Sequence, residues 1–381
     1  MPLTANWSYP TAIRFGAGRI SELGEACAAA GMKKPILITD RALATLPIAE
    51  TALAAMAEAG LGRAIFADVD ANPTGSNLEA GVAAFRAGGH DGVVAFGGGS
   101  GLDLGKAVAF MAGQTRPVWD FEDIGDWWTR ANPAGIAPIV AVPTTAGTGS
   151  EVGRASVITN EATTEKKIIF HPQFLPKVVI ADPELTVGMP RMITAGAGMD
   201  AFAHCLEAYC SPHYHPMSQG IALEGMRLVK DNLPLAYENP EDIEARANMM
   251  SAAMMGAVAF QKGLGAIHAI SHPIGAHHHT HHGVTNAVVM APVLAFNRKA
   301  VEERIAAAAA YLGLSGGFDG FASFVDDLTA RLNIPATLTG LGVKNPDIDL
   351  LVENALRDPS CGGNPVKLTA ANLKPLIESC F

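Results

Sequence analysis

Cysteine is scarce in this sequence, and no two cysteines have the CxxC spacing of a redox or metal motif. The chain has 381 residues and five cysteines: Cys27, Cys205, Cys210, Cys361 and Cys380. An odd number of widely separated cysteines in a chain of this size is not typical of a disulfide framework. The composition therefore favours a reducing compartment.

Basic residues are also few, with 27 Lys and Arg against 37 Asp and Glu and a formal net charge of -10. Nucleic-acid phosphates and anionic membrane surfaces are bound by clusters of Lys and Arg. The charge balance therefore argues against nucleic acid or a membrane surface as the main partner.

Long apolar runs are absent as well. No stretch approaches the roughly 20 apolar residues of a membrane span, and the longest candidates, such as residues 251–260, are rich in Ala and Met, as in a buried helix. The opening MPLTANWSYP has neither the basic start nor the apolar core of a signal peptide. We therefore expect a cytoplasmic protein.

The two halves of the sequence differ in their pattern of apolar residues, and we interpret them as two domains, residues 1–187 and 188–381. The first half alternates short apolar runs with amphipathic stretches, as expected for a parallel sheet covered by helices. Strands are predicted at 34–40, 63–69, 91–97, 138–143 and 178–182, and helices at 19–32, 47–60, 74–88 and 102–111. Beyond about residue 190 strand-like runs almost vanish, which predicts an all-helical second domain.

A glycine-rich turn, FGGGSGLDLGK, follows the predicted strand 91–97 and leads into a helix. Glycines there let backbone N–H groups reach a phosphate at a helix N-terminus, although a tight connection is the alternative. Asp40 ends the strand 34–40 and either accepts from a ribose hydroxyl or caps the next helix. The loop TTAGTGS (144–150) follows the strand 138–143 and suits phosphate or ribose contact, or merely helix capping.

Acidic and histidine side chains recur at helical spacing in the second half. Asp200 and His204 are four residues apart, as are His268 and His272, so each pair shares a helix face, and His282 follows. One aspartate and three histidines make an oxygen and nitrogen donor set that suits Fe(II) or Zn(II). Most of the run HHHTHH (277–282) is expected to be a solvated loop. Buried histidines need partners, so we predict a metal site here.

Seven segments at these places resemble the iron-containing (group III) alcohol dehydrogenases, whose relatives in fold include glycerol dehydrogenase and dehydroquinate synthase. The segments are FGGGSGLDLGKA, PTTAGTGSEV, KKIIF, ADPELT, GMDAFAHCLEAY, GAIHAISHPIGAHHHTHHGVTNAV and CGGNP. They span nearly the whole chain in the family's order. The resemblance implies a Rossmann-like dinucleotide-binding α/β domain with a parallel sheet, followed by an all-α domain, which is the dehydroquinate synthase-like fold.

The resemblance also implies roles for individual residues. The implied metal ligands are Asp200, His204, His268 and His282. The implied cofactor-binding residues are Asp40, Asn72, Gly98, Gly99, Ser100, Asp103, Thr144, Thr145, Thr148 and Lys167. Asp40 matches the position whose acid favours NAD over NADP, and Lys167 a lysine that reaches the ribose. The implied catalytic residues are His272, beside the reacting centre, together with Asp200 and His268. Cys361 matches a C-terminal loop.

One position departs from the family pattern. Many members have proline before the last metal histidine, where this chain has His281. The last metal ligand is thus either His281 or His282, and the fourteen-residue spacing from His268 favours His282.

The resemblance implies an NAD-dependent alcohol dehydrogenase that acts on a small alcohol, diol or (semi)aldehyde. Fe2+ or Zn2+ would act as a Lewis acid, NAD would carry the hydride, and His272 would relay a proton. A homodimer or higher homo-oligomer is expected. Two alternatives stay open: a dehydroquinate-synthase-like lyase, disfavoured by the few Lys and Arg between Asp200 and Asn297, and a non-catalytic metal or nucleotide sensor.

Overall fold

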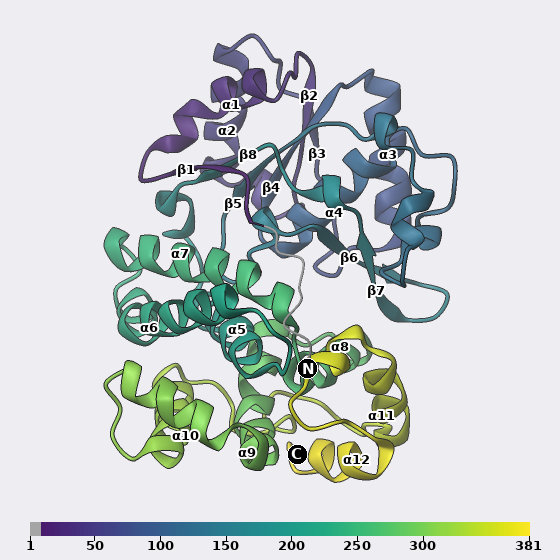
Figure 1. The fold of residues 1–381 in the computed structure, drawn as a ribbon. Helices are drawn as coiled ribbons and strands as arrows, with labels where there is room; N and C mark the ends of the chain where they lie inside the picture. The colour runs from purple at the N-terminus through teal and green to yellow at the C-terminus, as the bar shows by residue number, and fades with distance from the viewer. Residues whose placement is uncertain (1–8) are drawn as a thin grey trace. The chain divides into compact units, whose positions relative to one another are not determined.

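The computed structural model describes residues 9–381 and divides into two compact units (Figure 1). The sheet unit comprises Tyr9–Thr145 and Gly149–Val187. The helical unit comprises Ala146–Thr148 and Gly188–Phe381 among the described residues. Each unit is considered by itself below.

The sheet unit is built on six parallel strands in the order β1-β8-β5-β4-β2-β3. The strands are β1 (Ala12–Phe15), β2 (Pro35–Ile38), β3 (Ile65–Phe66), β4 (Gly92–Gly97), β5 (Ile139–Pro143) and β8 (Val178–Ala181). The chain runs from β2 outward to β3, and then returns to place β4 on the other side of β2. The strand order therefore reverses between β2 and β4, which is where open α/β sheets bind ligands.

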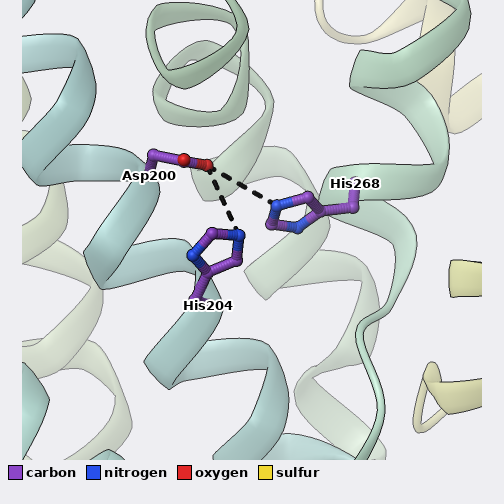
Figure 2. Close-up of side chains that lie close together, drawn as sticks. All are labelled: Asp200, His204 and His268. Carbon is purple, nitrogen blue, oxygen red and sulfur yellow. Dashed lines mark ion pairs between the residues drawn. The ribbon is translucent and has the colours of Figure 1, made fainter. Parts of the chain in front are cut away.

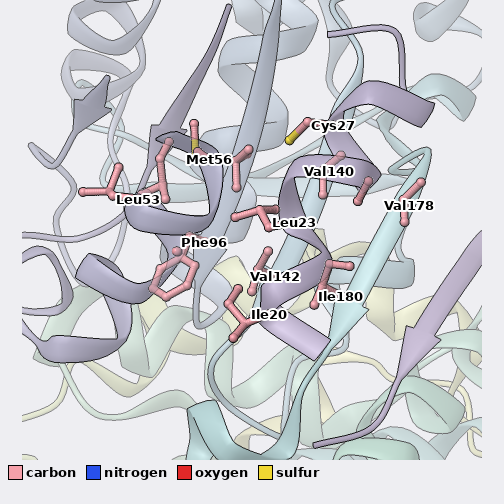
Figure 3. Close-up of a cluster of buried hydrophobic side chains, with 14 of the residues drawn as sticks. Ile20, Leu23, Cys27, Leu53, Met56, Phe96, Val140, Val142, Val178 and Ile180 are labelled. Carbon is pink, nitrogen blue, oxygen red and sulfur yellow. The ribbon is translucent and has the colours of Figure 1, made fainter. Parts of the chain in front are cut away.

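Four helices cover the two faces of this sheet: α1 (Leu23–Ala29), α2 (Pro47–Glu58), α3 (Gly75–Gly88) and α4 (Gly99–Met111). Alternate residues of a strand point to opposite faces. Val94 and Phe96 of β4 accordingly join α1 and α2 in one buried apolar cluster (Figure 3). Ala95 faces α4, where a β-carbon on Gly105 would come within 2.6 Å of the alanine's own. Burial on both faces explains the near-continuous apolar runs of the strands.

All five predicted strands are confirmed as β2, β3, β4, β5 and β8, with bounds that differ by at most three residues. Three strands escaped prediction. β1 is a four-residue edge strand, and β6 (Ala155–Asn160) and β7 (Glu165–Phe170) form a separate antiparallel hairpin whose side chains are mostly half-buried. The predicted helix 102–111 begins earlier, at Gly99, so the glycine turn forms the first turn of α4. The predicted helix 19–32 opens with a 3-10 turn (Arg19–Glu22) before α1.

The helical unit contains eight α-helices among its described residues and no strand, as predicted. They are α5 (Arg191–Cys210), α6 (Pro216–Glu238), α7 (Ile243–Ala259), α8 (Ala266–His278), α9 (His282–Tyr311), α10 (Gly317–Arg331), α11 (Ile348–Arg357) and α12 (Ala370–Glu378). Every residue of α5 from Thr194 onward is buried, because the chain packs α6, α7 and α9 around it. Across residues 9–381, no helix has the length and hydropathy needed to cross a bilayer.

Candidate functional site

Helices α5 and α8 bring an aspartate and two histidines together inside the helical unit (Figure 2). Asp200 and His204 lie one turn apart on α5, and His268 lies in the first turn of α8. One ligand atom from each residue lies within 4.8 Å of the other two. Oδ1 of Asp200 is 3.7 Å from Nε2 of His204 and 3.6 Å from Nε2 of His268. All three side chains are buried.

His282 approaches the same carboxylate oxygen from a third helix. It is the first residue of α9, and its Nε2 lies 3.4 Å from Oδ1 of Asp200. The preceding His281 is the N-cap of α9, and its Nδ1 accepts the backbone N–H of Val284. The two neighbouring imidazoles thus differ in position: His282 faces Asp200, and His281 caps the helix.

The histidine run is less of a loop than the sequence suggested. His277 and His278 belong to the last turn of α8, and only residues 279–281 lie between α8 and α9. His279 ends α8 in the left-handed conformation, with φ 53°. This abrupt end lets α9 begin at once, so that His282 points back toward α5.

The charged side chains of this cluster shift one another's pKa values. Burial would raise the pKa of the Asp200 carboxyl, but the imidazoles of His204, His282 and His268 outweigh it and hold that pKa well below its usual range. Burial lowers the pKa of His204 to about 4. It also acts to lower the pKa of His268, but the carboxylates of Glu207 and Asp200 prevail and raise it to about 10. The buried carboxylates of Asp200 and Glu207 therefore favour positive charge on the imidazole of His268.

Two residues that the sequence reasoning missed hold the cluster in place. Glu207, on α5, accepts Nδ1–H of His268 at 2.5 Å and the backbone N–H of Ile267 at 2.7 Å. Asn286, on α9, donates its amide to Oδ1 of Asp200 at 2.7 Å, and is fully buried. Helical spacing could have found both, because Glu207 follows His204 by three residues and Asn286 follows His282 by four. A carboxylate on the far nitrogen of an imidazole is the usual support of a metal-ligating histidine.

The donor set fits a divalent transition metal. Four ligand atoms held tetrahedrally about 2.1 Å from an ion are about 3.4 Å apart, and the three Asp-to-His spacings are 3.4, 3.6 and 3.7 Å. The three Nε2 atoms converge on one oxygen, Oδ1 of Asp200, as the ligands of a shared ion would. The buried Nδ1 of His204 also has no hydrogen-bond partner within residues 9–381. Imidazole and carboxylate together suit iron or zinc.

His272 lies beside this cluster, one turn after His268 on α8. Its ring stacks on that of His282 with centroids 5.2 Å apart. Its Nδ1 donates to Oδ2 of Asp358 at 2.7 Å. Burial would raise the pKa of the Asp358 carboxyl, but His272 outweighs burial and lowers it to about 2. The Asp358 contact orients the ring and leaves Nε2 as the atom that can accept a proton.

In the sheet unit, the predicted cofactor residues gather where the strand order reverses. Gly98 caps α4, and Gly99 and Ser100 open it at the end of β4. The side chain of Thr145, after β5, lies against Gly98, where a β-carbon would come within 3.1 Å of it. The backbone N–H of the buried Thr144 donates to Gly97, and Ser100 Oγ donates to Ala71, next to the half-buried Asn72.

Asp40 follows β2, on the other side of the reversal, and its Oδ1 accepts the backbone N–H of Leu43. This matches the capping alternative for one of its two carboxylate oxygens. Oδ2 has no hydrogen bond within the described residues, so the ribose alternative also stays open.

Three further predicted cofactor residues, and Cys361, have other surroundings. Asp103 accepts from Ser150 Oγ and from the backbone N–H of Val157, so it braces the loop rather than projecting from the turn. Lys167, on β7, lies 3.2 Å from a carboxylate oxygen of Glu122 and 2.9 Å from one of Glu165. Thr148 belongs to the short segment assigned to the helical unit. Cys361 lies in a 3-10 turn (Pro359–Gly363) rather than a loop.

Lys106 and Glu151 are two buried side chains of opposite charge that interact within the sheet unit. Lys106, on α4, is fully buried and donates to the carbonyls of Ser150 and Ala155. Burial lowers its pKa. Glu151 is also buried, and burial raises the pKa of its carboxyl to about 7, although Lys106 opposes the shift.

We therefore expect stability of the sheet unit to depend on Glu151 between pH 4.5 and 7. The folded unit holds this proton over a range where the unfolded chain has lost it, so the contribution is complete below pH 4.5 and is lost as pH rises through 7. The full change is about 3 kcal/mol. Thermal midpoints measured from pH 5 to 8 should fall for the wild type relative to Glu151→Gln. Glu58→Gln, at an exposed position on α2, is the control and should follow the wild type; parallel curves for all three proteins would refute the assignment.

Comparison with known proteins identifies matches along the whole chain. The family model described as "Iron-containing alcohol dehydrogenase" matches residues 10–183, and the C-terminal model of the "Fe-containing alcohol dehydrogenase family" matches residues 194–381. The chain is 39% identical over 380 residues to a 4-hydroxybutyrate dehydrogenase of Cupriavidus necator, covering 97% of this chain and 98% of that protein.

Two solved structures are similar throughout. The crystal structure of a 1,3-propanediol oxidoreductase aligns with a TM-score of 0.94 at 35% identity, covering 99% of this chain and 100% of that one. A sulfoacetaldehyde reductase from Bifidobacterium kashiwanohense, in complex with NAD+, aligns with a TM-score of 0.89 at 31% identity, covering 99% and 98%.

Proposed function

The chain belongs to the iron-containing alcohol dehydrogenase family, and we propose that it transfers a hydride between NAD(H) and a small alcohol, diol or (semi)aldehyde. The convergence of Asp200, His204, His268 and His282 from three helices is the observation that carries this proposal. NAD is the cofactor of the family, and a similar structure is an NAD+ complex. A homodimer or higher oligomer and a cytoplasmic location stay predictions of the sequence.

Asp200, His204, His268 and His282 would hold the metal. When bound, iron or zinc supplies Lewis-acid chemistry that favours ionisation of an alcohol hydroxyl and polarises a carbonyl. The chain's own contribution is rigidity: Glu207 and Asn286 fix the imidazole of His268 and the carboxylate of Asp200 before any ligand arrives. Such fixed outer contacts commonly change metal affinity or activity by 10- to 100-fold when they are removed.

Gly98, Gly99, Ser100, Thr144 and Thr145 would hold the cofactor pyrophosphate at the start of α4, where backbone N–H groups and the helix dipole favour an anion. Asn72 and the free Oδ2 of Asp40 border the same end of the sheet, and Thr148 and Lys167 are proposed as further contacts. Asp103 supports the loop through Ser150. When bound, NAD supplies the hydride-transfer chemistry.

His272 would move the proton that the alcohol loses. Because Nδ1 donates to Asp358, the lone pair lies on Nε2, which takes the proton on alcohol oxidation and returns it on carbonyl reduction. Asp358 acts as a positioning residue by fixing this tautomer.

The lyase alternative finds no support in the helical unit. Of its few cations between Asp200 and Asn297, the two buried ones are occupied: Arg246 donates to Pro240 O and Thr194 Oγ1, and Lys262 donates to the carbonyls that end α5. The three N–H groups of Lys262 are all used, and Arg246 is buried with only Nη2 left without a partner among the described residues. Turnover of NADH with an aldehyde would exclude the sensor alternative.

The test is NADH oxidation by chelator-treated protein, before and after addition of Fe(II) or Zn(II). The aldehydes should include succinic semialdehyde and 3-hydroxypropionaldehyde, the carbonyl counterparts of the alcohols in the relatives' names. Metal-restored turnover with at least one aldehyde is expected. NADH and metal binding without turnover across the panel would favour the sensor.

A further inference from the structure

Helix α8, which carries His268, begins without a cap of its own. Its N-cap is Gly265, which has no side chain to accept the first backbone N–H groups. The start of α8 is buried, so its backbone N–H groups are shielded from bulk solvent. Buried N–H groups at a helix start need partners from elsewhere in the fold.

Two side chains far away in the sequence supply these acceptors. Oδ1 of Asn364 accepts the N–H of Ala266 at 3.1 Å, and Oε1 of Glu207 accepts that of Ile267 at 2.7 Å. The next residue is His268, whose ring is held by the other oxygen of Glu207. Two hydrogen bonds from outside the helix, to the consecutive residues Ala266 and Ile267, therefore set the position of His268.

Asn364 is itself held rigidly. Its amide exchanges two hydrogen bonds of 2.9 Å with Asn297 of α9, and its Nδ2 also donates to the carbonyl of Val366. The preceding Gly363 packs so tightly that a β-carbon there would lie 2.0 Å from the carbonyl oxygen of Leu264. Asn364 thus uses all its hydrogen-bonding capacity, and links the C-terminal segment CGGNP, α8 and α9.

We propose that Asn364 is a positioning residue for the metal centre, which acts on His268 through the start of α8 and is tethered by Asn297. This inference rests on the proposed function, because it takes His268 as a metal ligand. It gives the CGGNP segment a role through α8, without direct contact with the donor atoms.

The experiment measures the Zn(II) dissociation constant of the full-length protein by competition with a chelator of known affinity, and the visible spectrum of the Co(II)-substituted protein. Asn364→Ala is expected to raise the dissociation constant about 10-fold and to change the Co(II) bands, because His268 is displaced. Asn297→Ala, which removes only the tether, should raise it about threefold.

Asn372→Ala is the matched control. Asn372 lies in the same C-terminal segment and caps α12 through its contact with Thr369, with no link to α8. The Asn372→Ala variant should have a lower thermal midpoint but keep the wild-type Zn(II) affinity and Co(II) spectrum.

Wild-type affinity in a folded Asn364→Ala would overturn the inference. If Asn364→Ala does not fold, Asn297→Ala decides in the same way. If instead His268→Ala binds Zn(II) as tightly as the wild type, the proposed metal centre itself fails.

Discussion

Replacing His268 by alanine is expected to lower metal-restored turnover by about a thousandfold. His268 lies at the middle of the donor cluster, 3.6 Å from Asp200 Oδ1, and is the imidazole that Glu207 fixes. Lewis-acid stabilisation contributes several kcal/mol, and each 1.36 kcal/mol is a factor of ten in rate. The measurement is NADH oxidation at saturating aldehyde after chelator treatment and readdition of Fe(II) or Zn(II).

His277→Ala provides the matched control, because this histidine lies on the same helix but contacts Asn354 instead of the cluster. Its turnover should stay within about twofold of the wild type. Bound metal should be measured in each variant, since loss of activity in His268→Ala with full metal content would assign His268 a role other than ligation. Equal activity in both variants would remove the metal centre from the mechanism.

Gly283→Ala is expected to cost about 3 kcal/mol of stability in the helical unit and to weaken metal binding. A β-carbon at Gly283 would lie 2.0 Å from the carbonyl oxygen of Gly196 and 3.0 Å from Cβ of Asp200. Helices α5 and α9 meet here backbone to backbone, so neither neighbour is a flexible side chain that can move aside. The added methyl must push α9 away, and His282 with it. Thermal unfolding should show a midpoint lowered by about 6–10 °C.

Gly220→Ala tests the same chemical change where space is open. Gly220 lies exposed on α6, and a β-carbon there meets nothing within 4 Å. Because alanine is the better helix former by about 1 kcal/mol, this variant should be as stable as the wild type or slightly more stable. If Gly283→Ala unfolds at the same temperature as Gly220→Ala and binds metal normally, then the close contact of α5 and α9 does not set the geometry of the centre.

The elements of this protein follow from local pattern. Strands buried on both faces need apolar residues at nearly every position, so β4 and β5 are predicted from the continuous apolar runs GVVAFG and IVAVP. Helical spacing likewise puts Asp200 and His204 on one face of α5. The elements that escaped prediction are β1 and the β6–β7 hairpin, which are short or half-exposed and lack a continuous apolar run.

The partners of the chemical residues were decided only by tertiary structure. His281 and His282 are chemically identical in the sequence, and only the fold shows that His282 faces Asp200 while His281 caps α9. The contact of His272 with Asp358 and that of Ala266 with Asn364 join residues 86 and 98 positions apart. No periodicity reaches across such distances. The sequence by itself therefore determined the buried strands, the helical character of the second half and the candidate donors, because these depend on local burial and spacing. Packing of α5, α8 and α9 decided the orientation of the donor side chains and their hydrogen-bond partners, because hydrogen bonds between distant segments form only once the helices are assembled.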